Sequence, residues 1–95
     1  MIQVEYCRIH TEDAILIVAI MNIQETLDRG ELLEIRIEKE NDMDVYAEFT
    51  LPAYHCHHAY GFKETELMQL EQFLRDNAVT IWRMGKGEIV AEGAA

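Results

Sequence analysis

The residues AILIVAIM, 14–21, form the longest apolar run in the chain, and their conformation decides the fold. A helix over residues 12–28 would gather four apolar side chains on one face: Leu16, Ile20, Ile23 and Leu27. A buried strand over 14–21 is the alternative, because half of these eight residues are β-branched and such side chains favour strands.

The residues on either side of the run favour the helix. Thr11 is suited to cap a helix N-terminus, and Glu12 and Asp13 suit the positive end of a helix dipole. Arg29 suits the negative end, and Gly30 lies where a glycine commonly follows a helix. We therefore expect the helix and keep the strand as the alternative.

Three other segments alternate between apolar and polar residues, as half-buried strands do. They are residues 2–9 (IQVEYCRI), 31–40 (ELLEIRIEKE) and 44–51 (DVYAEFTL). The last two are separated by Asn, Asp and Met at 41–43, and the first two of these residue types favour tight turns. We expect an antiparallel hairpin at about 32–51.

The second half of the chain predicts a helix and then a strand. Residues 63–77, KETELMQLEQFLRDN, repeat apolar residues at intervals of three and four. Residues 78–84, AVTIWRM, are rich in β-branched and aromatic residues, and 88–95 predict a brief further strand. The resulting order, β-α-β-β-α-β, is that of a ferredoxin-like two-layer α+β sandwich. A chain of 95 residues is expected to form a single domain over 1–95.

The charge of the chain excludes some classes of partner. Eighteen acidic residues against eight basic ones give a net charge of −10. Nucleic acids and anionic membrane surfaces are bound by Lys and Arg, so we expect no direct nucleic-acid binding and no membrane binding. A basic partner protein fits this charge better.

The sequence also indicates a compartment. The first ten residues, MIQVEYCRIH, lack the basic and apolar regions of a secretory signal. The longest apolar run has eight residues, whereas a membrane span needs about 20. Cys7 and Cys56 are too few for a disulfide framework. We expect a cytoplasmic protein with reduced thiols.

The segment LPAYHCHHAYGF, residues 51–62, is the clearest candidate for metal chemistry. It contains four potential ligands: His55, Cys56, His57 and His58. Imidazole and thiolate groups bind zinc or nickel, and Cys7 and His10 could complete such a site. The interpretation that we prefer is a polar loop with its histidines in solvent. We expect no cofactor, and keep zinc as the alternative.

The predicted hairpin is strongly acidic. Five of its acidic residues are candidates for partner binding: Glu34, Glu38, Asp42, Asp44 and Glu48. Depending on register, Glu38 could lie opposite Asp44 and Glu34 opposite Glu48, where like charges destabilise a sheet. Such residues protect a sheet edge from aggregation, or they form a docking surface for a basic protein.

Part of the chain resembles a family of short bacterial domains of unknown function, often encoded beside toxin–antitoxin-like partners. The resemblance covers about half the chain, in AEFTL (47–51), YGFKETELMQLEQFLRDN (60–77) and IW (81–82). Its main positions are Gly61, Phe62, Glu66, Leu67, Leu70, Phe73, Asn77 and Trp82. Where the family has His-x-His, this chain has Glu34-Ile35-Arg36, so no role of those histidines carries over.

These observations predict a small, non-enzymatic protein that binds a basic partner, like an antitoxin or a phage-encoded inhibitor of a nucleic-acid-handling protein. No pair of acidic residues is spaced for acid–base catalysis. The alternative is a metal-binding or metal-sensing module built on residues 55–58. Because the run 14–21 is apolar on every side of a helix, we also expect a symmetric homodimer that buries part of it.

Overall fold

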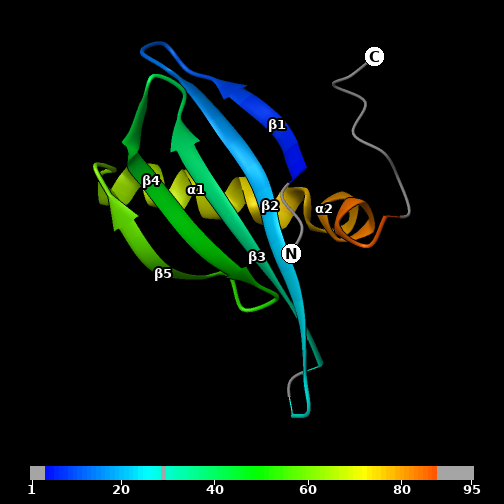
Figure 1. The fold of residues 1–95 in the computed structure, drawn as a ribbon. Coiled ribbons are helices and arrows are strands. Elements are labelled where there is room, and N and C mark those ends of the chain that lie inside the picture. The colour runs from blue at the N-terminus through cyan, green and yellow to red at the C-terminus, as the bar shows by residue number, and fades with distance from the viewer. Residues whose placement is uncertain (1–3, 29, 88–95) are drawn as a thin grey trace.

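The computed structural model describes residues 4–28 and 30–87, which form a five-stranded antiparallel sheet followed by two helices (Figure 1). The strands are β1 (Val4–His10), β2 (Ile15–Thr26), β3 (Gly30–Lys39), β4 (Asp42–Leu51) and β5 (His55–Tyr60). The helices are α1 (Glu64–Asp76) and α2 (Ala78–Gly85). Each strand pairs with its neighbours in sequence, so the sheet is a simple meander from β1 to β5.

The expected ferredoxin-like order, β-α-β-β-α-β, is therefore wrong. The helix expected over 12–28 is replaced by β2, which pairs with β1 on one side and β3 on the other. Leu16, Val18 and Ile20 of β2 are buried, while the residues between them are half-buried. Burial at every second residue is the strand period, and the β-branched residues are well suited to it. Gly30 has a positive φ of 72° and begins β3 after the tight β2–β3 turn, rather than following a helix.

The strand expected over 78–84 is also wrong, because these residues form α2. Asn77 lies between the two helices, and its carbonyl accepts a hydrogen bond from the Ile81 amide at 2.9 Å. Ile81, Met84 and Gly85 are buried, which is the spacing of one helix face. Gly85 permits a close approach to the sheet, since a Cβ there would lie 2.8 Å from Leu33 Cδ1.

Other expectations agree with the described residues. The hairpin at about 32–51 is present as β3 and β4, and residues 64–76 form α1. The segment 55–60, treated above as a loop, is strand β5 at one edge of the sheet. The brief strand expected over 88–95 lies outside the described residues. None of the described helices is long and apolar enough to cross a membrane.

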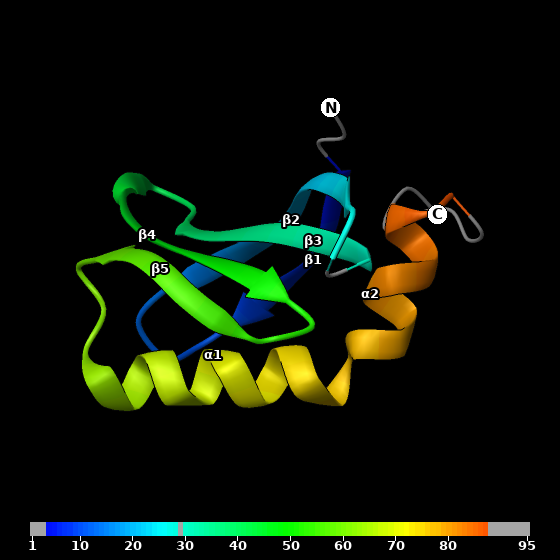
Figure 2. The same cartoon turned by 90° about the horizontal axis from the view of Figure 1, so that it is seen from below.

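Figure 2 shows α1 lying along one side of the sheet, which we call the covered face, and α2 rising beside the sheet from the end of α1. Gly85 of α2 faces the side chains of Leu33 and Ile23, so α2 also packs on core residues of this face. The core lies between the helices and β2, β3 and β4, and its fully buried members include Ile20, Leu33, Ile35, Phe49, Leu74 and Ile81. Among the described residues no polar or charged side chain is buried.

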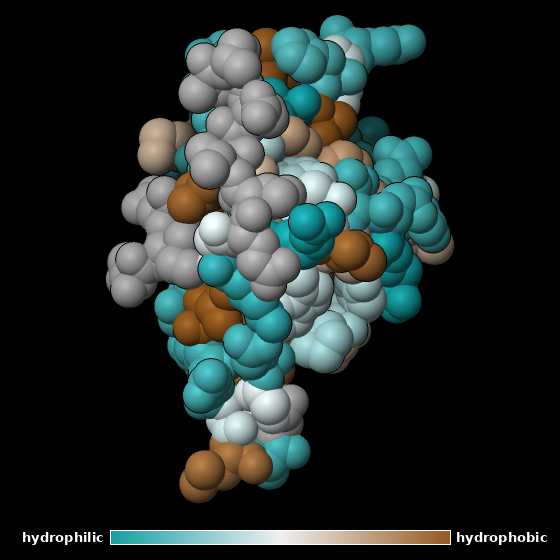
Figure 3. Space-filling view, turned by 90° about the vertical axis from the view of Figure 1, so that its right-hand side faces the viewer, coloured by the Kyte–Doolittle hydropathy of each residue, from teal (hydrophilic) through white to brown (hydrophobic). Residues whose placement is uncertain are grey.

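The opposite side, which we call the open face, has none of the described helices over it (Figures 1 and 2). It carries the side chains that alternate with the core residues, including Ile17 and Ala19 of β2, Arg36 of β3 and Glu48 of β4. Figure 3 looks onto the edge of the molecule. On this side the hydrophobic side chains are mostly scattered among hydrophilic ones.

Candidate functional site

Arg36 is at the centre of the acidic hairpin on the open face. Arg36 lies opposite Glu48, so Glu48 does not face Glu34 as the sequence suggested. Glu38 lies opposite Tyr46 rather than Asp44, because it continues the register in which Arg36 lies opposite Glu48. The two like-charged pairs that the sequence suggested for this hairpin are therefore absent.

The Arg36 guanidinium binds two of the candidate partner-binding residues. Its Nε donates to Glu38 Oε2 at 3.0 Å, and its Nη1 donates to Glu48 Oε2 at 2.9 Å. It also lies 4.1 Å from the centroid of the Tyr46 ring. Partial burial lowers the pKa of Arg36, but the hydrogen bonds to both carboxylates outweigh this effect and raise the pKa above its ordinary value. Glu38 and Glu48 are thus partly neutralised within the chain.

The other three candidate acids have different surroundings. Glu34 Oε1 accepts hydrogen bonds from Gln24 Nε2 at 2.8 Å and from Asn22 Nδ2 at 3.4 Å. Asp42 Oδ1 accepts one from the backbone amide of Asp44 at 3.2 Å, and both aspartates are exposed near the β3–β4 turn. Asp42 also lies opposite Lys39 in the pairing of β3 with β4. Within the described part of the chain Glu34 and Asp44 form no ion pair, so their charge stays available to a partner.

An apolar stripe runs along β2 beside these charges. It consists of Ile15, Ile17, Ala19 and Met21, all half-buried on the open face. Arg8 and Ile17 are register partners, and Arg8 pairs with Glu5 and Glu40 on the β1 side of the stripe. The stripe was not expected, because these residues were predicted to form a helix. The signal for it is the abundance of β-branched residues in a continuous apolar run, which favours a strand that contributes apolar side chains to both faces of the sheet.

The His-rich segment is divided between the two faces. In the pairing of β4 with β5, His58 lies opposite Glu48 and Cys56 lies opposite Phe49, with His57 in a bulge between them. Phe49 is a core residue, and Cys56 packs against the core on the covered face. Burial raises the pKa of the Cys56 thiol, with a smaller contribution in the same direction from Glu71.

His57 and His58 instead approach Glu48 on the open face. The two imidazole rings have centroids 5.3 Å apart, and those of His55 and His57 are 6.0 Å apart. One potential ligand atom from each of Glu48, His57 and His58 lies within 4.8 Å of the others. The structure thus brings together two of the four ligands considered from the sequence and adds a carboxylate. Cys7 and His10 are on β1, at the other edge of the sheet.

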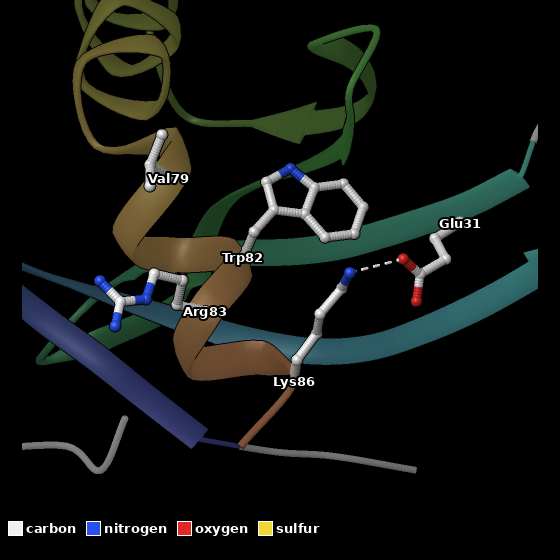
Figure 4. A pocket seen from close by; sticks show the side chains of 5 residues that line it. All are labelled: Glu31, Val79, Trp82, Arg83 and Lys86. Carbon is white, nitrogen blue, oxygen red and sulfur yellow. Dashed lines mark ion pairs between the residues drawn. The ribbon is translucent and has the colours of Figure 1, made fainter. Parts of the chain in front are cut away.

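A separate hollow of about 410 Å³ lies beside α2 (Figure 4). Val79, Trp82, Arg83 and Lys86 of the α2 region line it together with Glu31. Lys86 Nζ forms an ion pair with Glu31 Oε1 at 2.8 Å, so cation and carboxylate compensate each other there. This hollow was not expected, because residues 78–84 were predicted to form a strand.

Comparisons with known proteins add no relative: no family model, curated protein or solved structure matches this chain. The resemblance of residues 47–82 to a bacterial domain family stays an expectation.

Proposed function

We propose that this protein is a non-enzymatic docking protein that binds a basic, cytoplasmic partner protein on the open face of its sheet. The observation that carries the proposal is the apolar stripe of β2 with carboxylates on both sides. A stripe of this kind supplies the desolvated centre of a protein interface, and the charges around it supply the polar rim.

The charges at the border of the stripe favour a basic partner. By strand register the open face carries five carboxylates, from Glu5, Glu34, Glu38, Glu40 and Glu48. The arginines among them are Arg8 and Arg36, and both already bind carboxylates. Long-range attraction to such a surface accelerates association with a cationic protein.

The same charges oppose the pairing of two open faces. A face-to-face homodimer would bring like charges together around the stripe, and their repulsion would weaken the dimer. A cationic partner would be attracted by the same charges. The expected homodimer is thus the competing occupant of this face, and the experiment below distinguishes it.

A partner that handles nucleic acid fits the proposal, because such proteins carry clustered Lys and Arg. The acidic β3–β4 hairpin would then occupy a surface that otherwise binds phosphate. This is the mode of action of an antitoxin-like protein or of a phage-type inhibitor.

The test is capture from a host lysate followed by affinity measurement on the captured protein. The key variant reverses Glu34 on the open face and Asp44 at the exposed start of β4 to lysine. It leaves the Arg36 ion pairs and the Asp42 turn hydrogen bond in place. The control reverses Glu64 and Asp76 on α1, which are exposed and change the net charge equally.

We expect a basic protein to be captured and the key variant to bind it more than about tenfold more weakly, with the control close to wild type. Binding should also weaken as salt rises from about 50 to 500 mM, because the Debye screening length falls to a few ångströms. Equal losses in both variants, or salt-independent binding, would contradict the proposal. A light-scattering mass of twice the monomer without any basic partner would favour the homodimer.

A further inference from the structure

The geometry of β4 and β5 points to a function beyond docking: we propose that Glu48, His57 and His58 bind a divalent transition metal ion such as zinc. The site differs from the four consecutive residues 55–58. It uses two of them and a carboxylate from the neighbouring strand.

The bulge in β5 creates the cluster. In a regular strand adjacent residues point to opposite faces, so His57 and His58 would lie on different sides of the sheet. The register shift places His58 opposite Glu48 and leaves His57 as the extra residue. His57 then turns to the same side, and the three potential ligand atoms lie within 4.8 Å of one another.

The distance between these atoms suits a metal site after a small rotation of side chains. Zinc binds imidazole nitrogen and carboxylate oxygen at about 2.0–2.2 Å, so ligand atoms around it lie roughly 3–3.5 Å apart. Closing the cluster requires movements of about 1 Å. His57 and His58 are both exposed and have room to make that adjustment.

Arg36 orients the carboxylate of the cluster. Its Nη1 holds Glu48 Oε2 at 2.9 Å, and Arg36 is itself held by Glu38 and lies over the Tyr46 ring. The other oxygen of Glu48 is left for a metal. Outer hydrogen bonds that fix a ligand in this way are a regular feature of metal sites. The charge of Glu38 offsets that of Arg36, which would otherwise repel a cation.

Space for further ligands is present beside the cluster. A hollow of about 220 Å³ on the open face is lined by Glu34, Glu48 and His57, with Met21 and Asn22 of β2. Three protein ligands leave at least one coordination position of zinc for water or a ligand from outside the chain. Two imidazoles and one carboxylate also suit nickel, cobalt or iron(II). They do not suit calcium, which takes oxygen ligands only.

The experiment is a calorimetric titration of the tag-free protein with zinc chloride, repeated with cobalt chloride. We expect one metal per chain, and a loss of at least about tenfold in affinity in His57→Ala and in Glu48→Gln. His10→Ala is the matched control, because it removes an exposed imidazole at the other edge of the sheet. Its affinity should stay within about twofold of wild type.

Cys56→Ser separates this site from a site formed by residues 55–58. Because Cys56 packs on the covered face, the variant should keep its zinc affinity, and the cobalt-loaded wild type should show no thiolate charge-transfer absorption. Far-ultraviolet circular dichroism of each variant confirms that the fold is retained. The proposal is overturned if the wild type binds no metal, if Glu48→Gln binds as tightly as wild type, or if Cys56→Ser abolishes binding.

Discussion

The two faces of the sheet are built from the same strands but differ in nearly every physical property. The covered face contributes Ile20, Leu33, Ile35 and Phe49, each at most 1% exposed, and it packs against two helices. The open face presents carboxylates, arginines, histidines and the apolar stripe. Since neighbouring residues of a strand point in opposite directions, one sequence encodes a stable core and a chemically varied surface at once. The fold depends on one face, and the proposed functions depend on the other.

The largest expected effect is on the free energy of unfolding, when an isoleucine of β2 is replaced by alanine on one face or on the other. Ile20→Ala removes a fully buried side chain and should lower the free energy of unfolding by about 3–4 kcal/mol. Ile17→Ala makes the same chemical change on the half-buried open face and should cost about 1 kcal/mol. Urea denaturation of the two variants and the wild type measures both values.

Equal losses in these two variants would break the comparison between the faces. They would mean that the open face is covered in solution as completely as the core is. Repeating the measurement at several protein concentrations would then identify the cover, because a homodimer makes the unfolding midpoint depend on concentration.

A smaller effect is expected from the charges of the open face. Arg36→Met removes ion pairs to Glu38 and Glu48 and leaves two carboxylates close together, so it should cost about 1 kcal/mol at low salt. Arg75→Met on α1 is the matched control, because the Arg75 side chain is 50% exposed, forms an ion pair with Glu71 and, like Arg36, lies over a tyrosine ring, that of Tyr54. It should cost less than about 0.5 kcal/mol.

Salt distinguishes the electrostatic part of this effect. The difference between wild type and Arg36→Met should shrink between about 50 and 500 mM salt, as screening weakens both the attraction and the repulsion. A difference that does not change with salt would assign the role of Arg36 to packing of its side chain against Tyr46 instead.

Sequence periodicity predicted the parts of the fold where one pattern had no competitor. The hairpin of β3 and β4 alternates strictly and carries turn residues between its strands, and α1 repeats apolar residues at helical spacing. In β2 both periods were present. Leu16, Ile20 and Ile23 fit a helix face, while Leu16, Val18 and Ile20 fit a strand face. Pairing with β1 and β3 resolved the conflict, and such long-range pairing is not visible in a local pattern.

The candidate site shows the same limit. The sequence singled out His57, His58 and Glu48 as candidates in two separate segments, but a local pattern cannot join residues from two strands. Their proximity depends on the register of β4 with β5 and on a one-residue bulge. Likewise the role of Arg36 follows from its pairing opposite Glu48. In α2, burial of Ile81 and Met84 against the sheet outweighed the strand preference of AVTIWRM.

The smallest expected effect concerns the covered face, where Cys7 and Cys56 pack against the core. Burial raises the pKa of both thiols, and the charge of Glu5 contributes in the same direction at Cys7. In the unfolded chain thiols ionise near about pH 8.5, whereas the folded chain keeps them protonated to higher pH. Unfolding therefore releases protons in this range. The stabilisation is complete below about pH 8.5 and is lost as pH rises through the raised folded pKa values.

Urea unfolding at about pH 7.5 and pH 9.5 measures this effect, which should be less than about 1 kcal/mol after allowance for solvent screening. The matched variant is Cys7→Ala with Cys56→Ala. Its absolute stability is lower because packing is lost, but its decline between the two pH values should be smaller than that of wild type. The pKa of Tyr6 is also raised, first by burial and then by the charge of Cys7. The burial part is common to both proteins, whereas the part due to Cys7 is lost in the variant together with the thiols. Identical declines would show that the thiols are as accessible to water as the histidines on the open face.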